Sequence, residues 1–156
     1  MELISPYYPQ LQILAYVALA MVLGAVLGLE REIAHKPAGL RTHMMLSGAA
    51  TLLVALGEML VAHFEAESGQ STVRSDPLRI IEAVITGVSF LGAGTIIRHS
   101  STDQVEGLTT AASLLFAAAV GVTVAVGQVV LAAGITILAL LTLRGVQVTA
   151  RWFERR

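Results

Sequence analysis

The sequence contains no cysteine. Disulfide bonds, thiolate metal sites and cysteine nucleophiles are therefore excluded. Charge is also scarce: Asp, Glu, Lys and Arg make up 13% of the residues, against about 25% in soluble domains. The net charge of −1 gives no sign of a nucleic-acid partner, and we expect none.

In place of charge the sequence has long apolar runs. Hydrophobic residues make up 55% of the chain, and no residue from Leu108 to Leu143 is charged. As one straight helix that run would be about 54 Å long, whereas the hydrocarbon core of a bilayer is about 30 Å thick. A break near Gly127-Gln128 divides it in two. We therefore predict an all-α integral membrane bundle of five transmembrane helices, at about residues 11–29, 44–62, 78–97, 108–126 and 129–146.

The distribution of Lys and Arg predicts how the bundle is oriented. Residues 1–10 form a short lead without Lys or Arg, so we expect the first helix to be a signal anchor. A basic tail follows at 147–156. The positive-inside rule places the N-terminus outside and the C-terminus in the cytoplasm of a bacterial inner membrane. On the cytoplasmic side lie Arg31, Lys36, Arg41, Arg98, Arg144, Arg151, Arg155 and Arg156, and on the other side Arg74 and Arg79.

Glycines in two of the predicted helices indicate helix contacts. Gly24 and Gly28 form a GxxxG pair, and Gly87, Gly92 and Gly94 lie within eight residues of the third segment. In lipid, helices associate by close backbone approach rather than by the hydrophobic effect. We expect these five glycines to be packing positions. Because helices with small-residue faces bury little surface within one chain, we also expect a homo-oligomer.

The connector after the first segment is charged. Glu30 and Arg31 abut the apolar run, and charges at membrane depth usually pair and face protein. The connector either binds an ion, a lipid headgroup or a partner helix, or it only anchors the topology through internal ion pairs. The candidate residues are Glu30, Arg31, Glu32, Lys36, Pro37, Gly39, Arg41 and His43.

A second polar group lies on the same predicted side of the membrane. It consists of Arg98, Thr109, Thr110 and Ser113. Thr109 and Ser113 are four residues apart and share a helix face, so their hydroxyls can bond to a neighbouring helix. We expect one polar network that joins this group to the connector.

Two carboxylates lie inside the predicted helices. Glu82 follows Arg79 by three residues, so it either forms a local ion pair near the interface or faces a polar cavity. Glu58 has the same two interpretations. The four histidines are scattered, which makes a histidine metal site improbable. No nucleophile lies beside a base, and no loop could cradle a phosphate chain. We expect neither an enzyme nor a cofactor or metal.

Several stretches resemble the MgtC/SapB family of bacterial inner-membrane proteins. The first is Gly28-Leu-Glu-Arg-Glu-Ile-Ala-His-Lys-Pro-Ala-Gly-Leu-Arg-Thr-His43, and the others are residues 76–80, 87–98 and 107–113. They occur in the family's order and at similar spacing, across about residues 10–146. The sequence departs from the family pattern at Val88-Ser89 and Leu115-Phe116.

The resemblance implies a function that composition alone does not. The family is linked to survival in low magnesium and, in pathogens, inside macrophages. Its best-known members are thought to restrain the F-type ATP synthase through membrane contacts. Many members also carry a cytoplasmic ACT-like domain, which these 156 residues do not include. The alternative function is a transporter or channel for Mg²⁺, K⁺ or H⁺.

Overall fold

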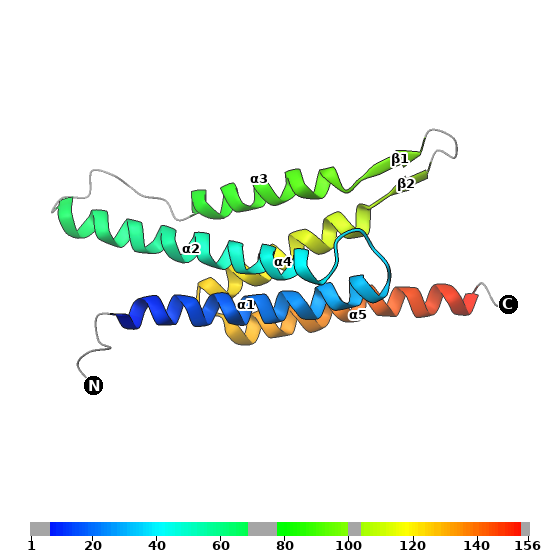
Figure 1. The fold of residues 1–156 in the computed structure, drawn as a ribbon, viewed down its shortest axis with the longest axis horizontal. Coiled ribbons are helices and arrows are strands. Elements are labelled where there is room, and N and C mark those ends of the chain that lie inside the picture. The colour runs from blue at the N-terminus through cyan, green and yellow to red at the C-terminus, as the bar shows by residue number, and fades with distance from the viewer. Residues whose placement is uncertain (1–6, 69–77, 100–103, 154–156) are drawn as a thin grey trace.

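The computed structural model describes residues 7–68, 78–99 and 104–153. Within them the chain forms five helices that run in alternating directions along one bundle (Figure 1). The predicted all-α membrane bundle is confirmed. The helices are α1 (Tyr8–Ile33), α2 (Leu40–Ser68), α3 (Leu78–Gly94), α4 (Leu108–Ala125) and α5 (Val129–Phe153).

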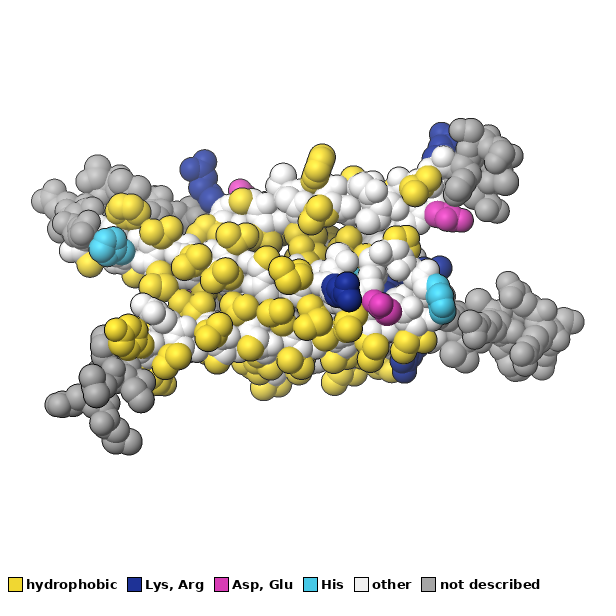
Figure 2. All heavy atoms as spheres, viewed as in Figure 1, with side chains coloured by type: hydrophobic (Ala, Val, Ile, Leu, Met, Phe, Trp, Pro, Cys, Tyr) yellow, Lys and Arg dark blue, Asp and Glu magenta, His cyan; other side chains and the backbone are white. Residues whose placement is uncertain are grey.

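Three of these helices are long and apolar enough to cross a membrane: Tyr8–Ile33, Leu40–Phe64 and Leu108–Ala125. The segment Val129–Gly145 is apolar but shorter. Figure 2 shows hydrophobic side chains over most of the helical surface on the visible face, with charged side chains mainly toward the ends of the helices. Such a surface is compatible with lipid along the helices and with water at their ends.

The third predicted segment ends earlier than expected. It was predicted to reach residue 97, but α3 ends at Gly94. The amides of Thr95 and Ile96 donate to the carbonyls of Gly92 and Ala93, three residues back, at 3.0 and 3.1 Å. These shorter-range bonds tighten and close the last turn.

A hairpin occupies the connector between α3 and α4, where the sequence predicted only a charged loop. Strand β1 (Ile97–His99) pairs antiparallel with β2 (Gln104–Glu106), with Arg98 opposite Val105. At the end of the hairpin, Gly107 has a φ of 92°. A side chain there would overlap the carbonyl oxygen of Thr95.

The other boundaries differ from the prediction mainly at helix ends. Helix α2 begins at Leu40, four residues before the predicted start at residue 44. Helix α5 continues to Phe153 through most of the predicted tail. The uncharged run does break near Gly127, which has a φ of 75°.

Helix α4 lies at the centre of the bundle and contacts the other four helices. One apolar cluster joins it to α1 and α5 and includes Leu27, Val120 and Val124. A second cluster joins it to α2 and α3 and includes Leu114 and Val84. The first turn of α4 therefore lies next to the ends of several helices, where polar groups on each can meet.

Candidate functional site

Helices α1 and α2 approach each other most closely at the two glycines of the GxxxG pair. A Cβ on Gly24 would lie 2.5 Å from the carbonyl oxygen of His43, and one on Gly28 would lie 2.7 Å from the Cα of Leu40. Such contacts are too short for any side chain. The glycines thus bring the C-terminal part of α1 against the N-terminal part of α2, as expected of a small-residue face in a membrane.

A buried arginine connects α1 to α4. Arg31, in the last turn of α1, is 1% exposed. Its Nη2 donates a hydrogen bond of 3.0 Å to the Oγ1 of Thr110, which is also buried. The sequence predicted a network containing these two residues, and the structure brings them together across 79 positions of sequence. Within the low dielectric of the bundle a charge-assisted bond of this kind is among the stronger hydrogen bonds.

A histidine makes the corresponding link between α2 and α4. His43 is fully buried, with its Nδ1 2.9 Å from the carbonyl oxygen of Gly39 and its Nε2 3.1 Å from the Oγ of Ser113. Because a carbonyl only accepts, Nδ1 carries a hydrogen. In the neutral ring Nε2 is then an acceptor, and it competes with the carbonyl of Thr110, 2.8 Å away, for the single hydrogen of the Ser113 hydroxyl.

The end of α1 also caps the start of α2. The Oε2 of Glu32 accepts a 2.7 Å hydrogen bond from the backbone N–H of Leu40, the first residue of α2. This bond satisfies one of the amides that every helix start leaves open. A Cβ on Gly39 would overlap the same carboxylate oxygen. Gly39 therefore does more than break the helix, because it admits the capping group.

We call Arg31, His43, Thr110 and Ser113 the polar network, and the end of the bundle that holds it the network end.

Sequence reasoning missed two residues that continue the polar network along α2. Ser47 and Thr51 are fully buried, and the hydroxyl of Thr51 donates to the carbonyl of Gly121 in α4 at 2.8 Å. The missed signal was their spacing, because residues 43, 47 and 51 repeat every four positions and share one helix face.

Three buried polar atoms of α1 and α2 have no hydrogen-bond partner among the described residues. They are Glu30 Oε2, Arg31 Nε and Ser47 Oγ. Glu30 is 4% exposed and lies close enough to Arg31 and His43 to interact with them electrostatically. An opposite charge next to Arg31 offsets part of the cost of burying it. The α1 end of the network therefore holds a cation and an anion side by side.

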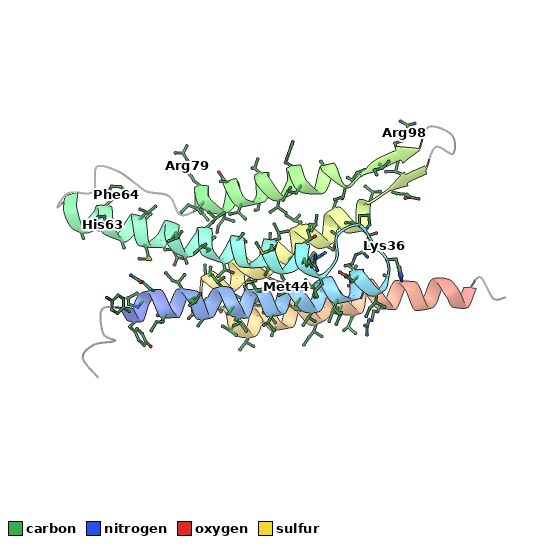
Figure 3. All side chains as sticks on the ribbon, in the orientation of Figure 1. Lys36, Met44, His63, Phe64, Arg79 and Arg98 are labelled. Carbon is green, nitrogen blue, oxygen red and sulfur yellow. The ribbon has the colours of Figure 1, made fainter. Side chains whose placement is uncertain are left out.

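Other residues of the predicted cluster lie outside the network. Lys36, Pro37, Arg41 and Thr109 are exposed. Thr109 and Ser113 line the same groove, but the threonine hydroxyl that bonds to a neighbouring helix is that of the buried Thr110. Figure 3 shows Lys36 on the connector between α1 and α2, and Arg98 on β1, which extends beyond α3.

The two carboxylates of the predicted helices also face outward. Glu58 and Glu82 are exposed. No ion pair between Arg79 and Glu82 forms among the described residues of α3, where both side chains are exposed, and the two interpretations of Glu82 stay predictions. Glu82 also does not line the groove of about 710 Å³ between α2 and α3, whose walls are apolar side chains such as Leu53 and Val84.

The three glycines of α3 have different surroundings. A Cβ on Gly92 would lie 3.3 Å from the Cβ of Ala111 in α4, which is close packing. A Cβ on Gly87 or on Gly94 would have no atom of another residue within 4 Å. Of these three glycines, only Gly92 packs against another helix among the described residues.

The donor set of the network is suited to hydrogen bonding more than to holding a metal. In residues 7–68, 78–99 and 104–153, no group of three His, Asp or Glu side chains is placed to hold an ion. The network itself consists of an arginine, a histidine and two hydroxyls. Its geometry joins three helices at one end of the bundle.

The fold and the network define a class of protein, a multi-pass helical membrane protein whose first, second and fourth helices are tied together by buried polar side chains. The family model described as the MgtC family matches residues 17–152. The chain belongs to the MgtC family, and the resemblance drawn from its sequence motifs is confirmed.

Similar proteins carry related names. An uncharacterized protein of Haemophilus influenzae is 37% identical over 138 residues, which are 88% of this chain and 57% of that protein. Protein SapB of Bacillus subtilis is 36% identical over 121 residues, 78% of this chain and 50% of SapB. Protein MgtC of Salmonella typhimurium is 36% identical over 109 residues, 70% of this chain and 41% of MgtC. The chain thus spans about half the length of these relatives. No solved structure matches the chain.

Proposed function

We propose that this protein supports growth in low magnesium by contacts with other membrane proteins, as the MgtC/SapB resemblance implies. The observation that carries the proposal is the family match over residues 17–152. The geometry supports contact in preference to transport, because Arg31 and His43 are used in joining helices. Apolar side chains such as Val120 and Val124 fill the bundle between α1, α4 and α5.

Growth of a bacterium that lacks its own MgtC-family gene tests this proposal. The full chain should restore growth in medium with limiting magnesium and have no effect when magnesium is abundant. Arg31→Met should abolish the rescue, whereas Arg79→Met, an equal loss of charge at an exposed site of α3, should retain it. Failure of the wild-type chain at normal membrane levels would overturn the proposal.

The partner that we propose from the family resemblance is the F-type ATP synthase, and in pathogens the same contact would support intracellular survival. Inverted membrane vesicles that contain the chain should show slower ATP-driven proton pumping than vesicles without it. Equal pumping at equal synthase content would exclude this partner and leave the magnesium phenotype to another one.

Cation transport is the second candidate. Glu30 favours it, because a buried carboxylate with an unpartnered Oε2 is a group that could bind a cation or exchange a proton. Proteoliposomes with the purified chain should then show Mg²⁺, K⁺ or H⁺ flux that Glu30→Gln abolishes. Absence of flux from folded protein would leave the contact-mediated function.

We also propose that the protein lies in the inner membrane with its N-terminus outside, and that it forms a homo-oligomer. The lack of cysteine makes single-cysteine labelling clean. Arg41→Cys should react only with reagent on the cytoplasmic side, and Arg79→Cys only with reagent outside. The opposite pattern would reverse the orientation. A single-chain mass in nanodiscs would exclude the oligomer.

A further inference from the structure

A polar cavity of about 790 Å³ lies at the network end, beside the polar network. Its walls come from the end of α1, the connector after it, the hairpin and the residues just before it, the first turn of α4 and part of α5. Arg31 and Lys36 line it together with Thr109 and Thr110. Two other cavities among the described residues have mainly apolar walls, so this one differs from them in the chemistry that it offers to a ligand.

The first turn of α4 presents open backbone donors to this cavity. The first amide with a helical partner is that of Ala111, which donates to the carbonyl of Gly107 at 2.8 Å. The amides of Leu108, Thr109 and Thr110 precede it and have no partner among the described residues. Gly107 has no side chain that could cap them. A helix start of this kind carries partial positive charge and attracts anions.

A second observation points to the same kind of ligand. Arg31 lines the cavity and is 1% exposed, and its Nε has no partner among the described residues. Only its Nη2 is used, in the bond to Thr110. The cavity thus has a permanently charged, buried guanidinium on its wall, which is bonded to Thr110 in the first turn of α4.

The charges around the cavity give it a positive balance. Lys36 lies on the connector at this end of the bundle (Figure 3) and is exposed, so it can turn toward a bound anion. His35 also lines the cavity, with its Nδ1 2.9 Å from the carbonyl of Ile33. Glu106 of β2 is the one carboxylate on the walls formed by described residues, and it opposes an anion. Arg31, Lys36 and Glu106 together give the described walls one net positive charge, while the buried carboxylate of Glu30, which does not line the cavity, interacts with Arg31.

We propose that this cavity binds a phosphate group, held by the amides of α4, the hydroxyl of Thr109, Arg31 and Lys36. The group belongs either to a free phosphate ion or to the headgroup of an anionic lipid, since both present the same oxygens. The inference goes beyond the proposed function, because it assigns a ligand to the network end whether or not the chain acts on another membrane protein.

Two arms of one binding experiment distinguish the sources. The full chain in uncharged detergent is titrated with inorganic phosphate by calorimetry. In parallel it is reconstituted in nanodiscs of phosphatidylcholine with one quarter phosphatidic acid, and the lipid that it retains is measured by native mass spectrometry. Heat of binding in the first arm identifies the free ion. Retention of phosphatidic acid only in the second identifies the lipid.

Three variants test the assignment of the cavity. Lys36→Gln should weaken binding at least about tenfold, the size expected for loss of a charge-assisted bond. Arg41→Gln removes the same charge from an exposed site that does not line the cavity, so binding should be unchanged. Glu106→Gln should tighten binding, because it removes the opposing carboxylate.

The result that overturns the proposal is absence of binding in both arms, or equal weakening by Lys36→Gln and Arg41→Gln. Equal weakening would mean that only the general positive charge of this end attracts phosphate. Lys36 is exposed, so its variant is expected to fold, and circular dichroism with an unchanged elution volume verifies this. Because the assay uses purified protein, its failure is distinguishable from failure of the growth experiment.

Discussion

Helices α1, α2 and α4 are joined in a different way from α3. At Gly24 and Gly28 the backbones of α1 and α2 meet with no room for a side chain, and buried polar side chains tie both helices to α4. Helix α3 has two glycines with no neighbour, an apolar groove between it and α2, and no buried polar side chain among its described residues. The comparison indicates that α1, α2 and α4 form a fixed unit, to which α3 adds a more loosely packed face.

The largest expected difference between the two regions concerns the glycines. Gly24→Leu should lower the free energy of unfolding by roughly 3 kcal/mol or more, because the new side chain would push α1 away from α2. Gly87→Leu should change it by less than about 0.5 kcal/mol, since the position faces open space. Unfolding by sodium dodecyl sulfate in mixed micelles measures both. Equal losses would remove the distinction between the regions.

The next largest difference in the free energy of unfolding is expected when an arginine is lost from each region. Arg31→Met leaves the hydroxyl of Thr110 and the carboxylate of Glu30 without their neighbour, and should destabilise the protein by about 2 kcal/mol. Arg79→Met in α3 should be nearly neutral, because Arg79 is exposed. The same micelle assay compares them. A neutral Arg31→Met would mean that the bond to Thr110 only compensates for burying the charge.

Serine substitutions should separate the regions by a smaller margin. Ser113→Ala removes the bond to His43 Nε2 and should cost about 1 kcal/mol. Ser89→Ala at an exposed position of α3 should cost nothing measurable. Thermal unfolding followed by circular dichroism can detect the difference. A similar shift for both variants would contradict the assignment of Ser113 to the network.

Ser47 sharpens the comparison inside the tightly packed unit. Its Oγ is buried without a hydrogen-bond partner among the described residues, so Ser47→Ala should be neutral or slightly stabilising. Ser47 and Ser113 thus have opposite expected effects, although both are buried. If Ser47→Ala destabilised the protein as much as Ser113→Ala, the Ser47 hydroxyl would have a hydrogen-bond partner in the membrane, which would contradict this prediction.

Much of the fold could be predicted from the sequence, since apolar runs separated by charged connectors are a strong signal for membrane helices. The break at Gly127 was visible because the run was too long for one span. The hairpin was not, because Ile97 continues an apolar pattern and strand pairing depends on residues that lie further along the chain. The ends of α2 and α5 also exceeded the predicted spans, since helices continue past the apolar region.

The sequence predicted which residues form the polar network better than it predicted how they contact one another. Arg31, His43, Thr110 and Ser113 stood out as polar groups beside apolar runs. Spacing pointed to Thr109 as the partner of Ser113, whereas Thr110 is the buried threonine that bonds to Arg31. Intervals of three and of four residues both share a helix face, so spacing could not separate them. Gly87 and Gly94 looked like Gly92 in the sequence, and only the position of α4 tells them apart.

A double-mutant cycle on Arg31 and Thr110 tests the central claim, that buried polar bonds fasten the first, second and fourth helices together. The free energy of unfolding in mixed micelles is measured for the wild-type chain, Arg31→Met, Thr110→Val and the double variant. We predict that the two losses are not additive, with a coupling of about 1 kcal/mol, within the range found between membrane helices. Additive losses would contradict the claim and leave backbone packing at Gly24 and Gly28 as what holds these helices in place.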